Sequence, residues 1–331
     1  MKYPITVHLG NYNGMRDKIN GKGRIQTTME SFINCVPSLP NMDVRFMDNG
    51  SLDGSWEYIQ SIPFGIKESI PQIKIEPRWL LITANNMANM KKSIETSDMP
   101  YFWNVENDTY FFRGEEFVNE AIEVLEANPD INLVHMRRFT RIDEYDLPGV
   151  PKNLNRFSER RKTPSGVSFY VMEKRPEYAL WIPTGIRFEK EQFDVEAGYG
   201  KCPKGVVQIG AVREKDGEFE RLLTEHWNSY TSNGWIARRE ALKFLIDVYN
   251  PLGEMQMSRA FKKHFKAAKL AEDVFIEFGW KARDTSNEEE RRKTLEDAVN
   301  EEDSAEKYGV INSSYEGVNL KMPEDKLDVY S

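Results

Sequence analysis

Short apolar runs alternate with amphipathic segments through the first third of the chain. The apolar runs are rich in β-branched, aromatic and aliphatic residues, which is typical of buried strands. Predicted strands cover residues 5–9, 43–47, 72–75 and 101–105, and predicted helices cover 24–36, a short segment capped by Ser55, and 83–96. Because strand and helix alternate, the pattern predicts an α/β fold with a parallel sheet and right-handed crossovers. His8, inside the first strand, is expected to be a packed core histidine.

Polar residues follow the ends of three predicted strands. The first strand leads into the turn-forming loop 10–14 (GNYNG), and the second ends in 48–55 (DNGSLDGS). The last strand runs directly into Glu106-Asn107-Asp108. Open α/β folds bind ligands at the carboxyl ends of their strands. Two carboxylates separated by one residue suit Mg²⁺ or Mn²⁺, which also bind diphosphate oxygens; a solvated acidic turn is the alternative.

The order of these motifs resembles the inverting glycosyltransferases of family 2, which have the GT-A fold. Segment 48–55 is very close to the family's Asp-Asp/Asn-Gly-Ser-Thr-Asp-Gly-Ser signature, and 10–13 falls where the family has Pro-Thr-Tyr-Asn. Segment 86–91 falls at its Ala-Arg-Asn-x-Gly, and 106–108 at its Asp-x-Asp metal motif. The resemblance covers roughly residues 4–282, most closely the first 110. It implies a GT-A-type, Rossmann-like nucleotide-binding sheet flanked by helices, with an acceptor-side extension.

The resemblance implies a donor site for a nucleoside-diphosphate sugar of the UDP or GDP type. Asp48 would accept hydrogen bonds from the nucleotide base, and the backbone around Asn11 would hold the base and ribose. Asn13, Asn49 and Asn89 would line the same site.

The resemblance also implies a divalent metal ion, Mn²⁺ or Mg²⁺. Asp108 would bind the ion on the diphosphate, and Glu106 would lie near the ribose or the metal and its waters. A divalent cation stabilises the charge that develops on a diphosphate leaving group. The sequence departs from the family twice. Glu106 replaces the first Asp, and the family's arginine is missing, which leaves Lys91, Lys92 and Arg78 as candidates to replace it.

The second half of the chain offers fewer signals. A helix is predicted at 115–125, a strand at 131–135 and a closing strand at 275–280. Arg238 and Arg239 precede a predicted helix; they either steady the diphosphate or are exposed helix arginines. Glu277 stands where relatives carry a metal-binding His, so the third metal ligand stays open.

The resemblance places a general base at the start of a helix that follows the metal motif, and Glu254 fits that position. An inverting transfer needs one carboxylate to deprotonate the acceptor hydroxyl. A glutamate in a first helical turn is also favoured by the helix dipole alone. Asp194, Glu196 and the Glu272-Asp273 pair are the other candidates.

Composition limits the kinds of binding partner and the cellular location expected for this protein. A net charge of −8 over 331 residues argues against nucleic acid or an anionic membrane as the main partner. Cys35 and Cys202 form neither a disulfide framework nor a cysteine-rich metal site. The chain shows no signal-peptide layout and no transmembrane segment, so we expect a cytoplasmic protein.

Together these observations predict three regions: 1–110 as a nucleotide-sugar-binding half, 111–282 as an acceptor-binding and catalytic half, and 283–331 as a charged C-terminal tail. The expected function is metal-dependent inverting transfer of a sugar to an acceptor hydroxyl of a glycan. A sugar-phosphate nucleotidyltransferase would need a Gly-rich loop with Arg and Lys, which 10–14 lacks. A non-catalytic carbohydrate-binding or assembly protein on the same scaffold is the alternative.

Overall fold

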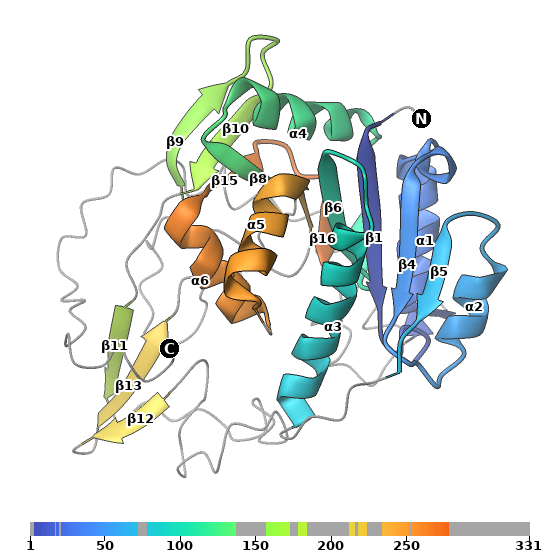
Figure 1. The fold of residues 1–331 in the computed structure, drawn as a ribbon, viewed down its shortest axis with the longest axis horizontal. Helices are drawn as coiled ribbons and strands as arrows, with labels where there is room; N and C mark the ends of the chain where they lie inside the picture. The colour runs from blue at the N-terminus through green and yellow to red at the C-terminus, as the bar shows by residue number, and fades with distance from the viewer. Residues whose placement is uncertain are drawn as a thin grey trace.

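One nine-stranded sheet runs through the centre of the molecule (Figure 1). The structure is a computed structural model that describes residues 3–16, 18–19, 21–71, 78–136, 157–172, 178–183, 212–215, 218–223, 234–251 and 253–277. The strands of the sheet, in spatial order, are β5 (Ile66–Ser69), β4 (Asp43–Asp48), β1 (Ile5–Asn11), β6 (Tyr101–Glu106), β14 (Trp235–Arg238), β8 (Ile131–His135), β15 (Lys266–Leu270), β10 (Ser168–Met172) and β9 (Phe157–Lys162).

Helices flank this sheet, and the other described strands form three small sheets. The helices are α1 (Arg24–Cys35), α2 (Ser55–Ser61), α3 (Arg78–Glu95), α4 (Glu116–Ala127), α5 (Arg239–Tyr249) and α6 (Glu254–His264), with a 3₁₀ turn at Leu39–Asn41. The small sheets pair β7 (Thr109–Phe111) with β16 (Phe275–Glu277), β2 (Lys18–Ile19) with β3 (Lys22–Gly23), and β13 (Glu218–Leu223) with both β11 (Tyr178–Pro183) and β12 (Val212–Lys215).

The predicted α/β class with a Rossmann-like sheet is confirmed. Strands β5, β4, β1 and β6 are all parallel, as the alternation of strands and helices predicts. Beyond β6 the sheet is mixed: β14 runs antiparallel to both β6 and β8, β15 runs parallel to β8, and β10 runs antiparallel to β15. The strand predicted at 72–75 lies outside the described residues, and the strand at the edge of the sheet is β5.

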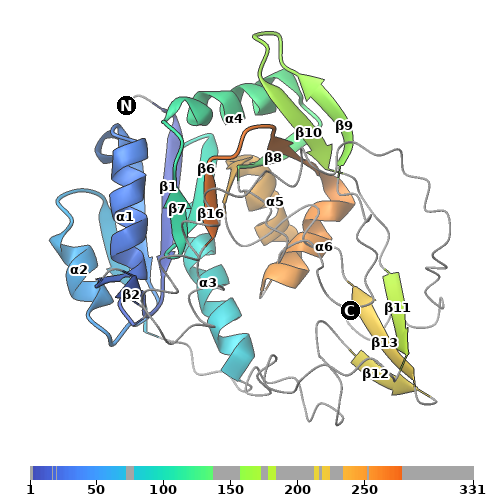
Figure 2. The same cartoon turned by 180° about the vertical axis from the view of Figure 1, so that it is seen from behind.

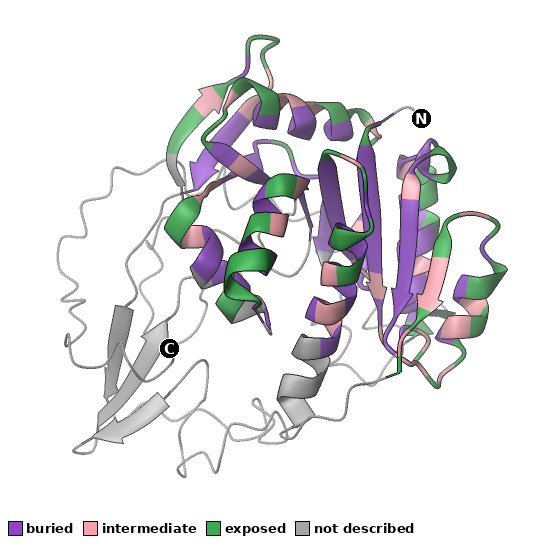
Figure 3. Cartoon of the chain, in the orientation of Figure 1, coloured by how far each residue is buried: buried purple, intermediate pink, exposed green. Residues whose placement is uncertain are grey.

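The two faces of the sheet have different partners. Along β1, Ile5, Val7 and Leu9 belong to a hydrophobic cluster that includes residues of α1 and α4. Of the alternate residues, His8 bonds to Ser93 on α3, and Thr6 bonds to Ser97, two residues after the end of this helix. The second cluster joins α3, α5 and α6 to the strands. Figures 1 and 2 show α1 and α3 on opposite faces. Both faces are thus covered, which explains why β1 is buried along almost its whole length (Figure 3).

An aromatic cluster anchors the end of β6. The Trp103 ring lies 4.9 Å from that of Phe32 on α1 and 5.4 Å from that of Phe117 on α4. Phe111 of β7 stacks on Phe32 with ring centroids 4.3 Å apart. The acidic turn between β6 and β7 is therefore held from both sides by large buried side chains.

One local prediction needs correction. Ser55 is the first residue of α2, not its cap; the cap is Gly54, whose φ of 88° suits glycine. Lys22 and Gly23 form β3, which pairs with β2 in a short hairpin. In the part of the chain that the structure describes, no helix is long and apolar enough to cross a bilayer.

The central sheet contains strands from residues 5–106 and from residues 131–270. Residues on both sides of the predicted boundary near residue 110 therefore contribute strands to the same sheet. The predicted tail at 283–331 lies outside the described residues.

Candidate functional site

The three polar motifs of the first third meet at one edge of the sheet. In the parallel register, Asn11 at the end of β1 pairs with Asp48 at the end of β4. On the other side of β1, Gly10 pairs with Glu106, the last residue of β6. The backbone N–H of Asn49 donates to the carbonyl of Asn11 at 2.8 Å, which continues the contact past the strand ends. The predicted convergence of these motifs is therefore present.

Asp48 is fully buried at the centre of this edge. Its carboxylate accepts hydrogen bonds from Asn11 Nδ2 at 2.7 Å, from the backbone N–H and Oγ of Ser51 at 2.9 and 2.6 Å, and from Ser69 Oγ at 3.1 Å. Four donors match the capacity of a carboxylate. A contact between Asp48 and a nucleotide base would thus require one of these donors to move away. In this arrangement Asp48 organises the loops that surround it.

The loops after β1 and β4 are braced against each other. Asn13, with φ of 47°, donates its backbone N–H to Ser51 Oγ at 2.9 Å and accepts from the N–H of Leu52 at 3.3 Å. Asp53 Oδ2 accepts from the backbone N–H of Met15 at 2.8 Å. Asn13 and its neighbour Tyr12 are only partly buried, so this double loop offers them to a ligand.

Amide side chains connect the loop after β4 to α3. Asn49 donates through Nδ2 to Asn86 Oδ1, and Asn89 donates through Nδ2 to Asn49 Oδ1. Asn89 is 1% exposed, and its own Oδ1 has no hydrogen-bond partner. The structure thus brings together Asn49 and Asn89, as the resemblance implied. It adds Asn86, whose three-residue spacing from Asn89 on a helix is the signal that could have identified it.

The acidic turn holds a buried carboxylate with one unpaired oxygen. Asp108 is 8% exposed, and its Oδ1 has no hydrogen-bond partner. On α1, Thr28 Oγ1 and Ser31 Oγ accept from the backbone N–H groups of Thr109 and Phe111, both at 3.2 Å. These two hydroxyls fix the start of β7 and so the turn that carries Asp108.

This turn fits a hard divalent cation. A buried carboxylate oxygen without a partner is costly, and a bound cation would remove that cost. Among the described residues, no three His, Cys, Asp or Glu side chains are grouped to hold a metal. One or two carboxylates are nevertheless enough for Mg²⁺, which takes its other ligands from water and substrate phosphates.

Asn107, between the two carboxylates, points into the protein. It is 8% exposed and donates through Nδ2 to Asn11 Oδ1 at 2.7 Å and to the carbonyl of Tyr12 at 3.3 Å. Sequence reasoning assigned it no role. From the sequence alone, an asparagine between two acids looks like an ordinary turn residue, because its hydrogen-bond partners are not visible there.

The lysines proposed to replace the family's arginine have other partners. Lys92 forms an exposed ion pair with Glu68 of β5. Lys91 donates to Asn250 Oδ1 after α5, and burial lowers its pKa, partly offset by Glu95. Neither contacts the amide chain from Asn49, and the side chain of Arg78 lies outside the described part of the structure. The replacement of the arginine by Lys91 or Lys92 is not supported.

Arg238 and Arg239 lie at the opposite edge of the sheet. Arg238 pairs with Tyr101, the first residue of β6, whereas Asp108 follows its last residue. The guanidinium of Arg238 donates to the carbonyl of Leu125, near the end of α4. Arg239 Nε donates to the carbonyl of Ile94, near the end of α3, at 2.8 Å. They cap helix ends, so the idea that they steady a diphosphate is wrong.

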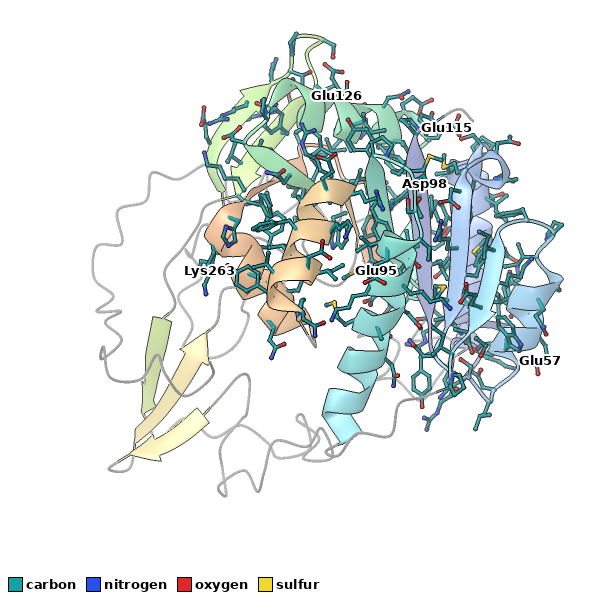
Figure 4. All side chains as sticks on the ribbon, in the orientation of Figure 1. Glu57, Glu95, Asp98, Glu115, Glu126 and Lys263 are labelled. Atoms are coloured by element: carbon teal, nitrogen blue, oxygen red, sulfur yellow. The ribbon has the colours of Figure 1, made fainter. Side chains whose placement is uncertain are left out.

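The candidate bases differ in what surrounds them. Glu254 is the first residue of α6, as predicted, and its side chain lies outside what the structure describes. The last turn of α6 is basic and includes Lys263 (Figure 4), so the helix carries charges that match its dipole.

The other candidates for the general base either form ion pairs or lie outside the described residues. Asp273 forms a buried ion pair with Lys269 at 2.8 Å, and Glu272 pairs with Arg113 at 3.1 Å. A general base takes up a proton, and protonation of Asp273 would leave the buried charge of Lys269 without its partner. This cost argues against Asp273 as the base. Asp194 and Glu196 fall outside the described residues.

Strand β16 returns to the acidic turn from far along the sequence. It pairs antiparallel with β7, so that Glu277 lies opposite Thr109, the residue after Asp108. The backbone register therefore places Glu277 next to the proposed metal motif, where the resemblance put it.

Comparison with known proteins gives distant structural similarity only. No protein-family model and no curated protein matches the sequence. Staphylococcus aureus TarS 1–349 in complex with UDP-GlcNAc is similar with a TM-score of 0.42 and 10% identity, over 82% of this chain and 57% of that chain. Mannosyltransferase PcManGT from Pyrobaculum calidifontis, in complex with GDP-Man and Mn²⁺, has a TM-score of 0.40 and 12% identity, over 90% of this chain and 65% of that chain.

A third solved structure has a different activity. A CMP:2-keto-3-deoxy-manno-octonic acid synthetase complexed with CTP has a TM-score of 0.40 and 9% identity, over 82% of this chain and 90% of that chain. The chain thus spans less than two thirds of the TarS and PcManGT chains.

Proposed function

We propose that this chain is a metal-dependent inverting glycosyltransferase of the GT-A type, with a nucleoside-diphosphate sugar as donor. One observation carries the proposal. The carboxyl ends of β1, β4 and β6 meet at a braced double loop, and beside it lies Asp108, buried with one unpaired oxygen. This edge is where open α/β sheets bind nucleotides.

The donor nucleotide would lie against the double loop. Tyr12 and Asn13 are partly buried and therefore reachable, while Asp48 and Asn11 hold the loops in place from below. Asn49 and Asn89 continue the polar lining toward α3. UDP and GDP donors are both compatible with these contacts.

The metal ion, Mn²⁺ or Mg²⁺, would be held by Asp108, with Glu106 beside it and Glu277 as the third candidate ligand. The ion would neutralise charge on the departing diphosphate. Asp108 contributes a carboxylate oxygen that no protein donor occupies, so it can bind the ion without first breaking a hydrogen bond.

Glu254 would act as the general base. It would take the proton of the acceptor hydroxyl while the acceptor oxygen attacks the anomeric carbon. The bond from the anomeric carbon to the diphosphate breaks on the opposite side, which inverts the configuration. The acceptor would be a hydroxyl of a glycan.

The proposal is tested by thermal shift with UDP, GDP, CDP and their sugars, each with and without Mn²⁺. A ligand that binds only the folded state raises the melting temperature. We expect one nucleotide to stabilise the protein only when Mn²⁺ is present, and Asp108→Ala to abolish that shift. Asp98→Ala is the matched control. Asp98 is an exposed acid in the segment that precedes β6 (Figure 4), and its replacement should leave the metal-dependent shift unchanged.

The same panel separates catalysis from binding. Glu254→Gln should keep the metal-dependent shift and lose transfer of sugar from the donor that binds. If wild-type protein binds a sugar nucleotide with Mn²⁺ but neither transfers nor hydrolyses it, a non-catalytic role is correct. If no nucleotide changes the melting temperature under any condition, the donor site itself is wrong.

A further inference from the structure

We propose that Asn107 is a positioning residue that couples nucleotide binding to metal binding. The inference rests on the proposed function and deepens it. Asn107 would bind neither the nucleotide nor the metal. It would instead transmit the position of the loop after β1 to the carboxylate of Asp108, the next residue.

A chain of hydrogen bonds joins the ends of three strands through Asn107. Its Nδ2 donates to Asn11 Oδ1 at 2.7 Å, and Asn11 Nδ2 donates in turn to Asp48 Oδ1 at 2.7 Å. The chain therefore runs from the end of β6 through β1 to β4. All three side chains are at least nine-tenths buried, so water does not replace these bonds.

The second bond of Asn107 reaches the part of the loop that a nucleotide would touch. Nδ2 also donates to the carbonyl of Tyr12 at 3.3 Å, and Tyr12 is partly exposed. The side-chain amide of Asn107 thus contacts the backbone of the proposed nucleotide loop, and the next residue in the chain is Asp108.

Gly14 shows how closely this contact is packed. A Cβ at Gly14 would lie 2.4 Å from Asn11 Oδ1 and 2.9 Å from Asn107 Nδ2. Both separations are too short for real atoms, so only glycine leaves room for the bond between the two asparagines. The added Cβ would also lie 2.9 Å from the Cβ of Ile25 on α1, so a side chain at position 14 disturbs the bond together with the packing on α1.

The rest of the turn is held independently. Thr28 and Ser31 on α1 bind the backbone of β7, and the aromatic cluster fixes β6. Loss of the Asn107 side chain should therefore weaken the link between the acidic turn and the loop after β1, and should affect the stability of the fold less. Coupling between two sites is reciprocal, so each ligand should tighten the other by the same factor.

The experiment is calorimetric titration with Mn²⁺ alone, with UDP and GDP alone, and with each nucleotide in the presence of Mn²⁺. The quantity compared is the ratio of nucleotide Kd values without and with Mn²⁺. For wild-type protein we expect a ratio of about ten or more, and for Asn107→Ala a ratio about fivefold smaller. Asn132→Ala removes an amide on β8 outside the network and should leave the ratio unchanged.

A merely structural role would lower the melting temperature of Asn107→Ala and leave this ratio at its wild-type value, which would overturn the inference. In an Asn11→Ala background, Asn107→Ala should lower the ratio by a smaller factor than in wild-type protein, because the bond to Asn11 is already lost and only the bond to the carbonyl of Tyr12 remains. Should Asn107→Ala fail to fold, Gly14→Ala tests the same bond and should lower the ratio as well.

The two proposals fail in different ways. If wild-type protein binds neither nucleotide with Mn²⁺, the proposed function is wrong and this inference falls with it. If wild-type protein shows the coupling and Asn107→Ala keeps it in full, only the role of Asn107 is wrong.

Discussion

At the scale of single residues, burial decides what an ionisable group does. His8 is 3% exposed on β1, and its Nδ1 lies 2.9 Å from Ser93 Oγ on α3. Burial, and then the charge of Arg45, lower the pKa of His8 to about 3. The expected core histidine is confirmed, and it is neutral in the folded protein at neutral pH.

The low pKa of His8 makes the protein sensitive to acid. In the unfolded chain the pKa is about 6.5, so below that pH the unfolded state binds a proton that the folded state excludes until about pH 3. Stability is therefore complete above pH 6.5 and falls as the pH drops toward 3. At pH 5 the loss from this group is about 2 kcal/mol.

The test is urea unfolding at pH 7 and pH 5 for wild-type protein and His8→Gln. The free energy of unfolding of the variant should fall by about 2 kcal/mol less between the two pH values. An equal fall in both proteins would mean that His8 is protonated in the folded state.

At the scale of elements, arginines close the ends of helices. The last turn of a helix leaves carbonyl groups without partners, and a cation there also interacts favourably with the helix dipole. Arg239 satisfies the carbonyl of Ile94 near the end of α3, and Arg238 does the same for Leu125 near the end of α4. The pair of arginines thus links α5 and β14 to two helices on opposite faces of the sheet.

Arg239→Ala should lower the free energy of unfolding by about 1–2 kcal/mol, because a charged hydrogen bond to a helix end is lost. It should leave the Mn²⁺-dependent nucleotide shift unchanged, since Arg239 lies at the edge of the sheet opposite Asp108. Chemical unfolding and the nucleotide panel measure the two effects. A variant of normal stability that loses the shift would restore the diphosphate role.

At the scale of the whole molecule, backbone hydrogen bonds at Gly234 connect several strands of the sheet. This residue precedes β14, donates its backbone N–H to the carbonyl of Asn104 at 3.1 Å, and accepts from the N–H of Met136 at 3.0 Å. Met136 accepts in turn from the N–H of Val274 at 2.9 Å. These bonds join β6, β8 and β14 to the segment that leads into β16, and thereby to the acidic turn.

Gly234→Ala should be strongly destabilising. Its φ is 78°, and a Cβ there would lie 1.9 Å from the ring of Phe275. Overpacking and the left-handed backbone together should cost about 3 kcal/mol. Gly166→Ala is the matched control: its φ is 102°, but a Cβ would meet open space, so it should cost about 1 kcal/mol. Equal losses in the two variants, measured by thermal unfolding, would show that packing on Phe275 contributes nothing.

Local pattern predicted the first half of the fold well. The apolar runs at 5–9, 43–47 and 101–105 form β1, β4 and β6, since strands buried on both faces are marked by continuous hydrophobic residues. It missed β5 (Ile66–Ser69), in which three of the four residues are polar and which lies at the edge of the sheet. An edge strand needs little hydrophobic surface, so its sequence carries little signal.

The sequence by itself determined the α/β class, the positions of these strands, and the edge at which Asn11, Asp48 and Asp108 meet, because parallel strands bring their carboxyl ends together. Only the tertiary structure decided what those side chains contact. The bonds from Asn11 and Ser69 to Asp48, the inward turn of Asn107, the helix-capping arginines and the return of β16 to β7 all join residues distant in the chain. Such contacts depend on packing geometry, which no local pattern of residues encodes.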